Sequence, residues 1–233
     1  MLAAKSKGRV DWLPYGADLE IFHPRQCQKC SGQGFGRWKE LCVSCHGSGI
    51  EETGRDIPIG FIGLLYAKRK SFIDHLASIY SAPIPILSGN VVVQDIDGIH
   101  PLDSVRRLAM NYQRIMIFVN LPSLSQLLVT KVVETMACGC CLLTPALAGA
   151  AAANMKPFEH GKHLLYYKED AKQLNTTLGN LLREPEICQD IGRTGEKEVR
   201  EKHSLRLRLE ELLRVVGART SAVTPVGQEV SAR

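Results

Sequence analysis

The sequence predicts an α/β protein: a parallel sheet flanked by helices, interrupted near its start by a small cysteine-rich insertion and followed by a helical C-terminal stretch. From residue 57 onward, apolar runs of strand length alternate with amphipathic runs of helix length. This alternation is typical of parallel strands joined by crossover helices. The apolar runs are nearly continuous, as expected for strands covered on both faces. The insertion is marked by two C-x2-C-x-G-x-G units between residues 27 and 49.

The expected elements follow in chain order. The strands are predicted at Ile57–Leu64, Ile84–Val93 (in one or two pieces), Ile115–Asn120, Cys140–Thr144 and His163–Tyr167. The helices between them are predicted at Lys68–Tyr80, Leu102–Tyr112 and Leu128–Cys138. Three more helices are predicted at Ala171–Arg183, Pro185–Glu201 and Ser204–Val216, with Pro185 in a first turn, where its missing N–H is tolerated. The alanine run at 148–153 fits either a short helix or a loop.

The same pattern divides the chain into four segments. Residues 1–24 are expected to open the α/β domain, and residues 25–50 to form the inserted finger. Residues 51–216 carry the alternating pattern and are expected to form the main domain. Residues 217–233 are rich in Ser, Thr, Ala, Val, Pro and Gly without periodicity, which predicts a disordered tail.

Charge and composition restrict the function classes. The 233 residues carry a formal charge of +5 and a pI near 8.8. Lys and Arg are interspersed with Asp and Glu, which favours a solvated surface that suits anionic ligands over a dedicated nucleic-acid face. No apolar leader occupies residues 1–10, and the longest apolar run, Ile57 to Ala67, is shorter than the roughly 18 residues that span a bilayer. We therefore expect a cytoplasmic protein without a membrane span.

The finger contains four candidate metal ligands, Cys27, Cys30, Cys42 and Cys45. Four thiolates close a tetrahedral structural zinc site, and in a reducing compartment paired C-x2-C units more often bind metal than form disulfides. Packing as four unliganded cysteines is the weaker alternative, because Gln, Lys, Ser and Gly surround them. The glycines after each pair permit the positive φ angles that turn the chain back toward the sulfurs. We expect one structural zinc per chain.

The repeated C-x2-C-x-G-x-G unit resembles the cysteine-rich region of J-domain co-chaperones, which carries four such units and two zinc ions. This chain has two units and lacks the His-Pro-Asp motif of the J domain, since His23-Pro24 is followed by Arg25. The resemblance therefore implies a metal site without implying a chaperone.

A second group of candidate residues lies where the Ile115–Asn120 strand is followed by the helix predicted at Leu128–Cys138. A helix that starts at the carboxyl end of a parallel strand offers free N–H groups and a positive dipole to a diphosphate. Thr130 and Lys131 are expected in its first turn. One turn later, Glu134 could accept hydrogen bonds from vicinal ribose hydroxyls.

The stretches Pro122-Ser-Leu-Ser-Gln126 and Lys131-Val-Val-Glu-Thr-Met-Ala-Cys-Gly139 resemble retaining GT-B glycosyltransferases of group 1, and more narrowly their CgeB-like branch. The resemblance implies the Rossmann-like, donor-binding half of such an enzyme. It places Glu134 at the donor ribose and Gln126 at the position of a family acidic residue, with loss of its charge. Ile59-Gly-Phe-Ile-Gly63 followed by Lys68 and Arg69 resembles the family's first strand, glycine turn and diphosphate-neutralising helix start.

Two functions follow as hypotheses. The first is a glycosyltransferase of hexosyltransferase type that binds a UDP- or GDP-sugar and transfers its glycosyl group, alone or with a partner chain that supplies an N-terminal acceptor domain. The zinc would be structural, and no residue is assigned as a general base. The alternative is a non-catalytic zinc-finger module that binds protein or, less favoured, nucleic acid on a degenerate glycosyltransferase scaffold, which Gln126 and the absence of an acceptor half in the sequence support.

Overall fold

The fold is that of a computed structural model, which describes residues 15–33, 40–43, 50, 54–63, 66–80, 101–121, 129–146, 158–168 and 171–220. Its strands are β1 (Ile57–Gly60), β2 (Ile115–Val119), β3 (Cys141–Pro145) and β4 (Leu165–Tyr167). Its helices are α1 (Ala67–Tyr80), α2 (Pro101–Arg114), α3 (Thr130–Ala137), α5 (Ala171–Arg183), α6 (Pro185–Lys202) and α7 (Leu205–Thr220).

The four strands form one parallel sheet in the order β1-β2-β3-β4. The predicted α/β class is confirmed, and each described strand lies within or at one residue of a predicted one. β4 is shorter than expected, because the N–H of His163 donates to the Glu159 carbonyl at 3.0 Å in a turn before the strand. The strand predicted at Ile84–Val93 lies outside the described residues.

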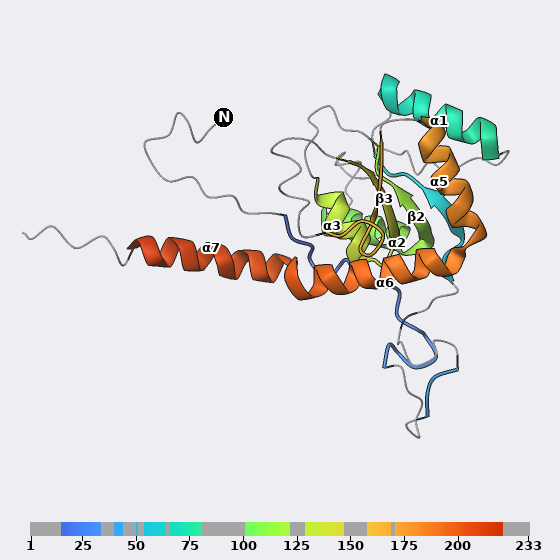
Figure 1. Ribbon diagram of the computed structural model, residues 1–233. Coiled ribbons are helices and arrows are strands. Elements are labelled where there is room, and N and C mark those ends of the chain that lie inside the picture. Colours follow the sequence, from blue (N-terminus) through green and yellow to red (C-terminus); the bar gives the residue numbers. More distant parts are fainter. Residues whose placement is uncertain are drawn as a thin grey trace, which may run out of the picture.

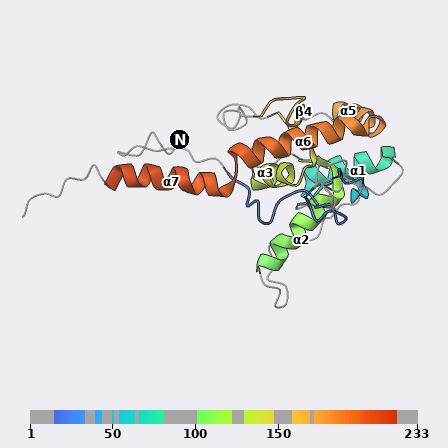
Figure 2. The ribbon, with the colours of Figure 1, turned by 90° about the horizontal axis from the view of Figure 1, so that it is seen from below.

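Helices cover both faces of the sheet, and the strand side chains alternate between them. Ile57, Ile115 and Leu142 point into a core with α2 and α3. Ile59, Ile117 and Leu143 point into a second core with α1 and α5. Figures 1 and 2 show α2 and α5 on opposite sides of the strands. Burial on both faces explains why the strand runs are nearly continuously apolar.

Helix α6 passes along the amino edge of the sheet, where the strands begin (Figure 1). Its Gly192 lies against the carbonyl of Gly139, just before β3, and a Cβ atom at Gly192 would be 2.4 Å from that oxygen. Only glycine permits this approach. Pro185 occupies the first turn of α6, as predicted.

Helix α7 continues from α6 away from the sheet (Figure 1). It ends at Thr220, so the prediction of a disordered tail from residue 217 is wrong for residues 217–220. Ala218 and Arg219 have high helix propensity, and they prolong the helix beyond Gly217. The rest of the predicted tail, 221–233, lies outside the described residues.

The described part of the opening segment packs on the main domain. Ala17 forms a parallel bridge with Ser204. The Ala17 N–H donates to the His203 carbonyl at 3.0 Å, and the Leu205 N–H donates to the Ala17 carbonyl at 2.8 Å. Phe22 is buried in the core next to Tyr112, with ring centroids 6.2 Å apart.

The finger (residues 25–50) leaves and rejoins the domain at the amino edge of the sheet. Gln26 and Ile50 pair as an antiparallel bridge at its base. Arg55, between the finger and β1, donates from Nη1 to the Ile115 carbonyl and from Nη2 to the Cys138 carbonyl, the latter at 2.7 Å. Its guanidinium therefore ties the starts of β1, β2 and β3 together.

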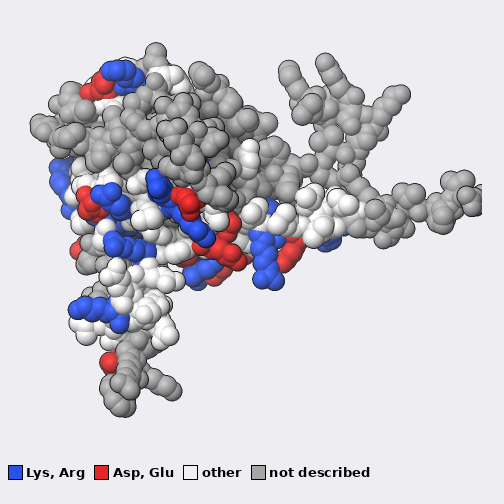
Figure 3. All heavy atoms as spheres, turned by 180° about the vertical axis from the view of Figure 1, so that it is seen from behind, with Lys and Arg blue, Asp and Glu red and all other residues white. Residues whose placement is uncertain are grey.

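Charged side chains on the described surface are largely paired. Figure 3 shows Lys and Arg intermixed with Asp and Glu on one face. Along α6, ion pairs join Glu196 to Arg200 at 3.2 Å and Glu198 to Lys202 at 2.9 Å. Over the described part of this face, the basic residues do not form a continuous tract.

Replacing Arg55 with Ala should destabilise the domain, because the carbonyl groups of two fully buried residues, Ile115 and Cys138, would lose these donors. A buried polar group left unsatisfied costs about 1–3 kcal/mol. For a chain of this size, each kcal/mol lowers the melting temperature by about 2–4 °C. We expect a fall of several degrees by scanning calorimetry.

Arg114→Ala is the matched control, because Arg114 also lies beside β2 but pairs with Asp56 at the surface, where the two side chains are 46% and 56% exposed. Its loss should change the melting temperature much less. Equal effects of the two substitutions would contradict the role assigned to Arg55.

Candidate functional site

The candidate site lies at the carboxyl edge of the sheet, opposite the finger. At this edge β1 leads through the turn at Gly63 toward α1, and β2 leads toward α3. Because neighbouring strands are parallel, the two turns meet at the same edge, which is where ligands bind in open α/β sheets.

Two cationic side chains converge on the turn at Gly63. The Lys131 ammonium donates to the Ile62 carbonyl at 3.1 Å. A Cβ atom at Gly63 would lie 3.0 Å from Lys131 Nζ and 3.5 Å from Arg69 Nη1, and Gly63 has a φ of +152°. A side chain at 63 would therefore crowd the Lys131 ammonium. We define Arg69 and Lys131 as the cation pair.

Aromatic rings hold the cation pair in place. The Phe61 ring lies 5.6 Å from the Arg69 guanidinium carbon and 5.4 Å from Lys131 Nζ. Tyr66 covers the guanidinium from 4.6 Å. Arg69 is only 8% exposed, although it is charged. These cation–π contacts offset part of the cost of removing the charges from water.

The environment disfavours a second positive charge at Lys131. Burial, and then repulsion by Arg69, lower the pKa of Lys131 from 10.5 to about 8. An anion placed between the two side chains would relieve this repulsion and favour the charged ammonium. The cation pair is therefore suited to bind a phosphate group or another compact anion.

Glu134 follows Lys131 by almost one turn of α3. Burial raises the pKa of its carboxyl from 4.5 to about 7, although a hydrogen bond with the Thr130 side chain and the charge of Lys131 act in the opposite direction. Ligand hydroxyls that donate to the carboxylate would stabilise its charged form. Thr130 lies in the first turn of α3, as the sequence predicts, although the helix begins at Thr130 and not at the predicted Leu128.

A polar group at the same edge was not predicted from the sequence. The Asn120 side chain, 9% exposed, donates from Nδ2 to Thr144 Oγ1 at 3.0 Å, and the Tyr167 hydroxyl donates to the Asn120 carbonyl at 2.8 Å. The buried Asn120 Oδ1 finds no hydrogen-bond partner in the part of the chain that the structure describes. The position of this polar residue at the end of an apolar strand was the available signal. Phe61 and Tyr66 carried no comparable signal.

The remaining predicted site residues fall into three groups. Lys68 lies in the first turn of α1, next to Arg69. Gln126 lies outside the described residues, as does Cys45. Cys27, Cys30 and Cys42 lie together in the finger, which joins the domain at the amino edge of the sheet, opposite the edge that carries the cation pair.

The sheet with helices on both faces defines a Rossmann-like α/β domain of the kind that forms one half of a GT-B enzyme. A family described as glycosyl transferase-like matches residues 69–214, more than half of the chain. The chain therefore belongs to the glycosyl transferase-like family.

Solved structures share this fold at low sequence identity. Sucrose-phosphate synthase from Thermosynechococcus elongatus superposes with a TM-score of 0.57 at 16% identity, over 92% of this chain and 54% of that one. The C-terminal domain of the glycosyl transferase group 1 family protein LpcC from Francisella tularensis superposes with a TM-score of 0.52 at 13% identity, over 82% of this chain and 100% of that one.

Anabaena HepE in complex with UDP-glucose superposes with a TM-score of 0.54 at 12% identity, over 87% of this chain and 56% of that one. The chain thus spans about half the length of sucrose-phosphate synthase and of HepE, and it matches the whole of the isolated LpcC C-terminal domain. No curated protein matches it in sequence. None of the described helices is both long and apolar enough to cross a bilayer.

The raised pKa of Glu134 makes stability depend on pH. Below about pH 4.5 the carboxyl is protonated in both the folded and unfolded states, so it has no effect. Between about pH 4.5 and 7 the unfolded state ionises first, and the protein loses stability as the pH rises. At about 1.4 kcal/mol per pKa unit, the full loss is roughly 3 kcal/mol.

Glu134→Gln should abolish this loss. The free energy of unfolding of the wild type, measured by urea denaturation, should therefore fall relative to that of the variant between pH 4.5 and 7.5. Lys131 stays protonated over most of this range, since its pKa is about 8. Parallel pH profiles for the two proteins would contradict the assignment.

Proposed function

We propose that the chain binds the diphosphate of a nucleotide-sugar at the cation pair and acts in glycosyl transfer. The convergence of Arg69 and Lys131 on the Gly63 turn carries this proposal. The cation pair lies at the carboxyl edge of a parallel sheet, and the chain belongs to the glycosyl transferase-like family. Family membership supports glycosyl transfer as the reaction, and the positive charge of the cation pair supports binding of the diphosphate here.

Glycosyl transfer requires stabilisation of a departing nucleoside diphosphate. The guanidinium of Arg69 can bind two phosphate oxygens in a fixed fork, and the Lys131 ammonium supplies a point charge beside it. The first turn of α3 adds backbone N–H groups at its positive end. Charge that develops on the leaving group would meet these donors already in position.

Glu134 is proposed to bind the ribose of the donor. Its carboxylate can accept two hydrogen bonds from vicinal hydroxyls, while Lys131, three residues earlier, contacts the diphosphate. UDP and GDP share ribose and diphosphate, so these contacts suit either nucleotide. The stretch from Lys131 to Gly139 further favours the CgeB-like branch of the family.

The acceptor and the transfer step are proposed to need a second domain or partner chain. The described chain spans about half the length of sucrose-phosphate synthase and of HepE. HepE has been solved with UDP-glucose, at 12% identity to this chain, so it supports the fold and makes UDP-glucose a reasonable first ligand to test.

A thermal-shift titration with UDP, GDP and their sugars tests the proposal. A ligand at 100 times its dissociation constant should add about 2.7 kcal/mol of stability and raise the melting temperature by several degrees. Arg69→Ala and Lys131→Ala should each weaken binding about tenfold or more, because a hydrogen bond to a charged group contributes about 1.5–3 kcal/mol.

Lys70→Ala is the matched control, since Lys70 neighbours Arg69 but points to solvent and pairs with Asp74 at 2.6 Å. The affinity of the Lys70→Ala variant for the nucleotide should match that of the wild type. Absence of any shift with all nucleotides, together with stabilisation by single-stranded nucleic acid or a protein partner, would replace the proposal with that of a non-catalytic binding module.

A further inference from the structure

Three cysteines of the finger bring their sulfur atoms together. Cys27, Cys30 and Cys42 have Sγ atoms that all lie within 4.8 Å of one another. The Sγ atoms of Cys27 and Cys42, which are far apart in the finger sequence, are separated by 3.8 Å. All three side chains are buried, with 2%, 6% and 8% exposure.

Hydrophobic packing does not explain this burial. The three cysteines form a buried cluster of their own that contains no aliphatic or aromatic residue from the described part of the chain. Their described neighbours Gln26, Gln28 and Lys29 are exposed and polar. A small loop with so little apolar surface needs another source of stability, and bound metal is the usual one.

The backbone of the finger turns tightly after the first cysteine pair. Ser31 and Gly32 both have positive φ angles, 52° and 78°. The N–H of Gly32 donates to the Cys27 carbonyl at 3.1 Å, and the N–H of Gln33 donates to the Cys30 carbonyl at 3.0 Å. The left-handed conformation is costly for Ser31, and it persists where the surroundings enforce it.

The sulfur separation distinguishes a metal site from a disulfide. A disulfide requires about 2.05 Å between sulfurs. In a tetrahedral zinc site with Zn–S bonds of about 2.3 Å, the sulfurs are about 3.8 Å apart. The separation of 3.8 Å between Cys27 and Cys42 agrees with the second geometry.

We propose that Cys27, Cys30 and Cys42 bind one zinc ion as thiolates, releasing their thiol protons to solvent. The sequence predicts Cys45, which lies outside the described residues, as a further ligand. A fourth sulfur would close the coordination sphere and leave no open position for a substrate or water. The role of the ion is to stabilise the finger.

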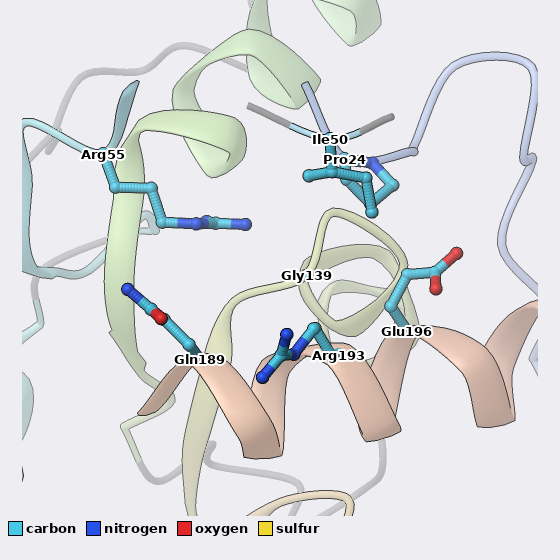
Figure 4. Close-up of a pocket in the computed structure, with 7 residues that line it drawn as sticks. All are labelled: Pro24, Ile50, Arg55, Gly139, Gln189, Arg193 and Glu196. Atoms are coloured by element: carbon cyan, nitrogen blue, oxygen red, sulfur yellow. The ribbon is translucent and has the colours of Figure 1, made fainter. Parts of the chain in front are cut away.

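The position of the finger supports this structural role. Its base borders a hollow at the amino edge of the sheet, where Pro24 and Ile50 face Gln189 and Arg193 of α6 and Arg55 reaches between them (Figure 4). The cation pair lies at the opposite, carboxyl edge. The zinc proposal is therefore independent of nucleotide binding, and each can fail without the other.

Elemental analysis of the full chain, purified from zinc-supplemented cells without chelators, tests the proposal. We expect about one zinc per chain, and at least a tenfold loss of zinc in Cys27→Ala and Cys42→Ala. Cys188→Ala is the matched control, because Cys188 is equally buried but lies in the core of the main domain. It should retain the zinc of the wild type.

If the variants fail to fold, cobalt substitution of the wild-type chain tests whether the finger cysteines bind a metal ion. Co²⁺ bound by thiolates in a tetrahedron gives intense visible absorption, which equimolar zinc should abolish. A folded wild-type chain without zinc and without this absorption would overturn the proposal. Zinc content unchanged in Cys27→Ala and Cys42→Ala would overturn it as well.

Discussion

The approach of Lys131 to the Gly63 turn is the contact on which the candidate site depends. It joins the turn after β1 to the first turn of α3, two segments nearly seventy residues apart in the chain, through a hydrogen bond of 3.1 Å. The parallel order of β1 and β2 makes the approach possible, and glycine at 63 leaves the space for it. Arg69 then places a second cation over the same aromatic ring, and its charge adds to burial in lowering the pKa of Lys131.

The two edges of the sheet carry different kinds of contact. The carboxyl edge carries Lys131 and Glu134, whose pKa values are altered, and the buried side chain of Asn120, a combination typical of functional sites. At the amino edge, Arg55 and the glycine contact between α6 and the turn before β3 hold elements together. The finger joins the domain at this second edge, away from the turn at Gly63.

Much of this arrangement could be predicted from sequence, because the signals were periodic. Continuous apolar runs located β1 to β4, and Pro185 located the start of α6. Cys140 and Cys141 begin the strand predicted at Cys140–Thr144, and both are buried in the core. Contacts between distant segments could not be predicted in the same way. The role of Arg55 depends on carbonyl groups sixty and more residues away, and the aromatic support of Arg69 by Tyr66 follows from a turn geometry that no local pattern specifies. Helix α7 extends beyond Gly217 because Ala218 and Arg219 favour helix, which the overall composition of residues 217–233 does not indicate.

A crystal structure of the chain soaked with UDP would show where the nucleotide binds. We expect diphosphate density between the Arg69 guanidinium and Lys131 Nζ, with the ribose beside Glu134. Diphosphate bound elsewhere, for example in the hollow next to Arg55 and Arg193, or a cation pair blocked by protein side chains at saturating UDP, would contradict this expectation.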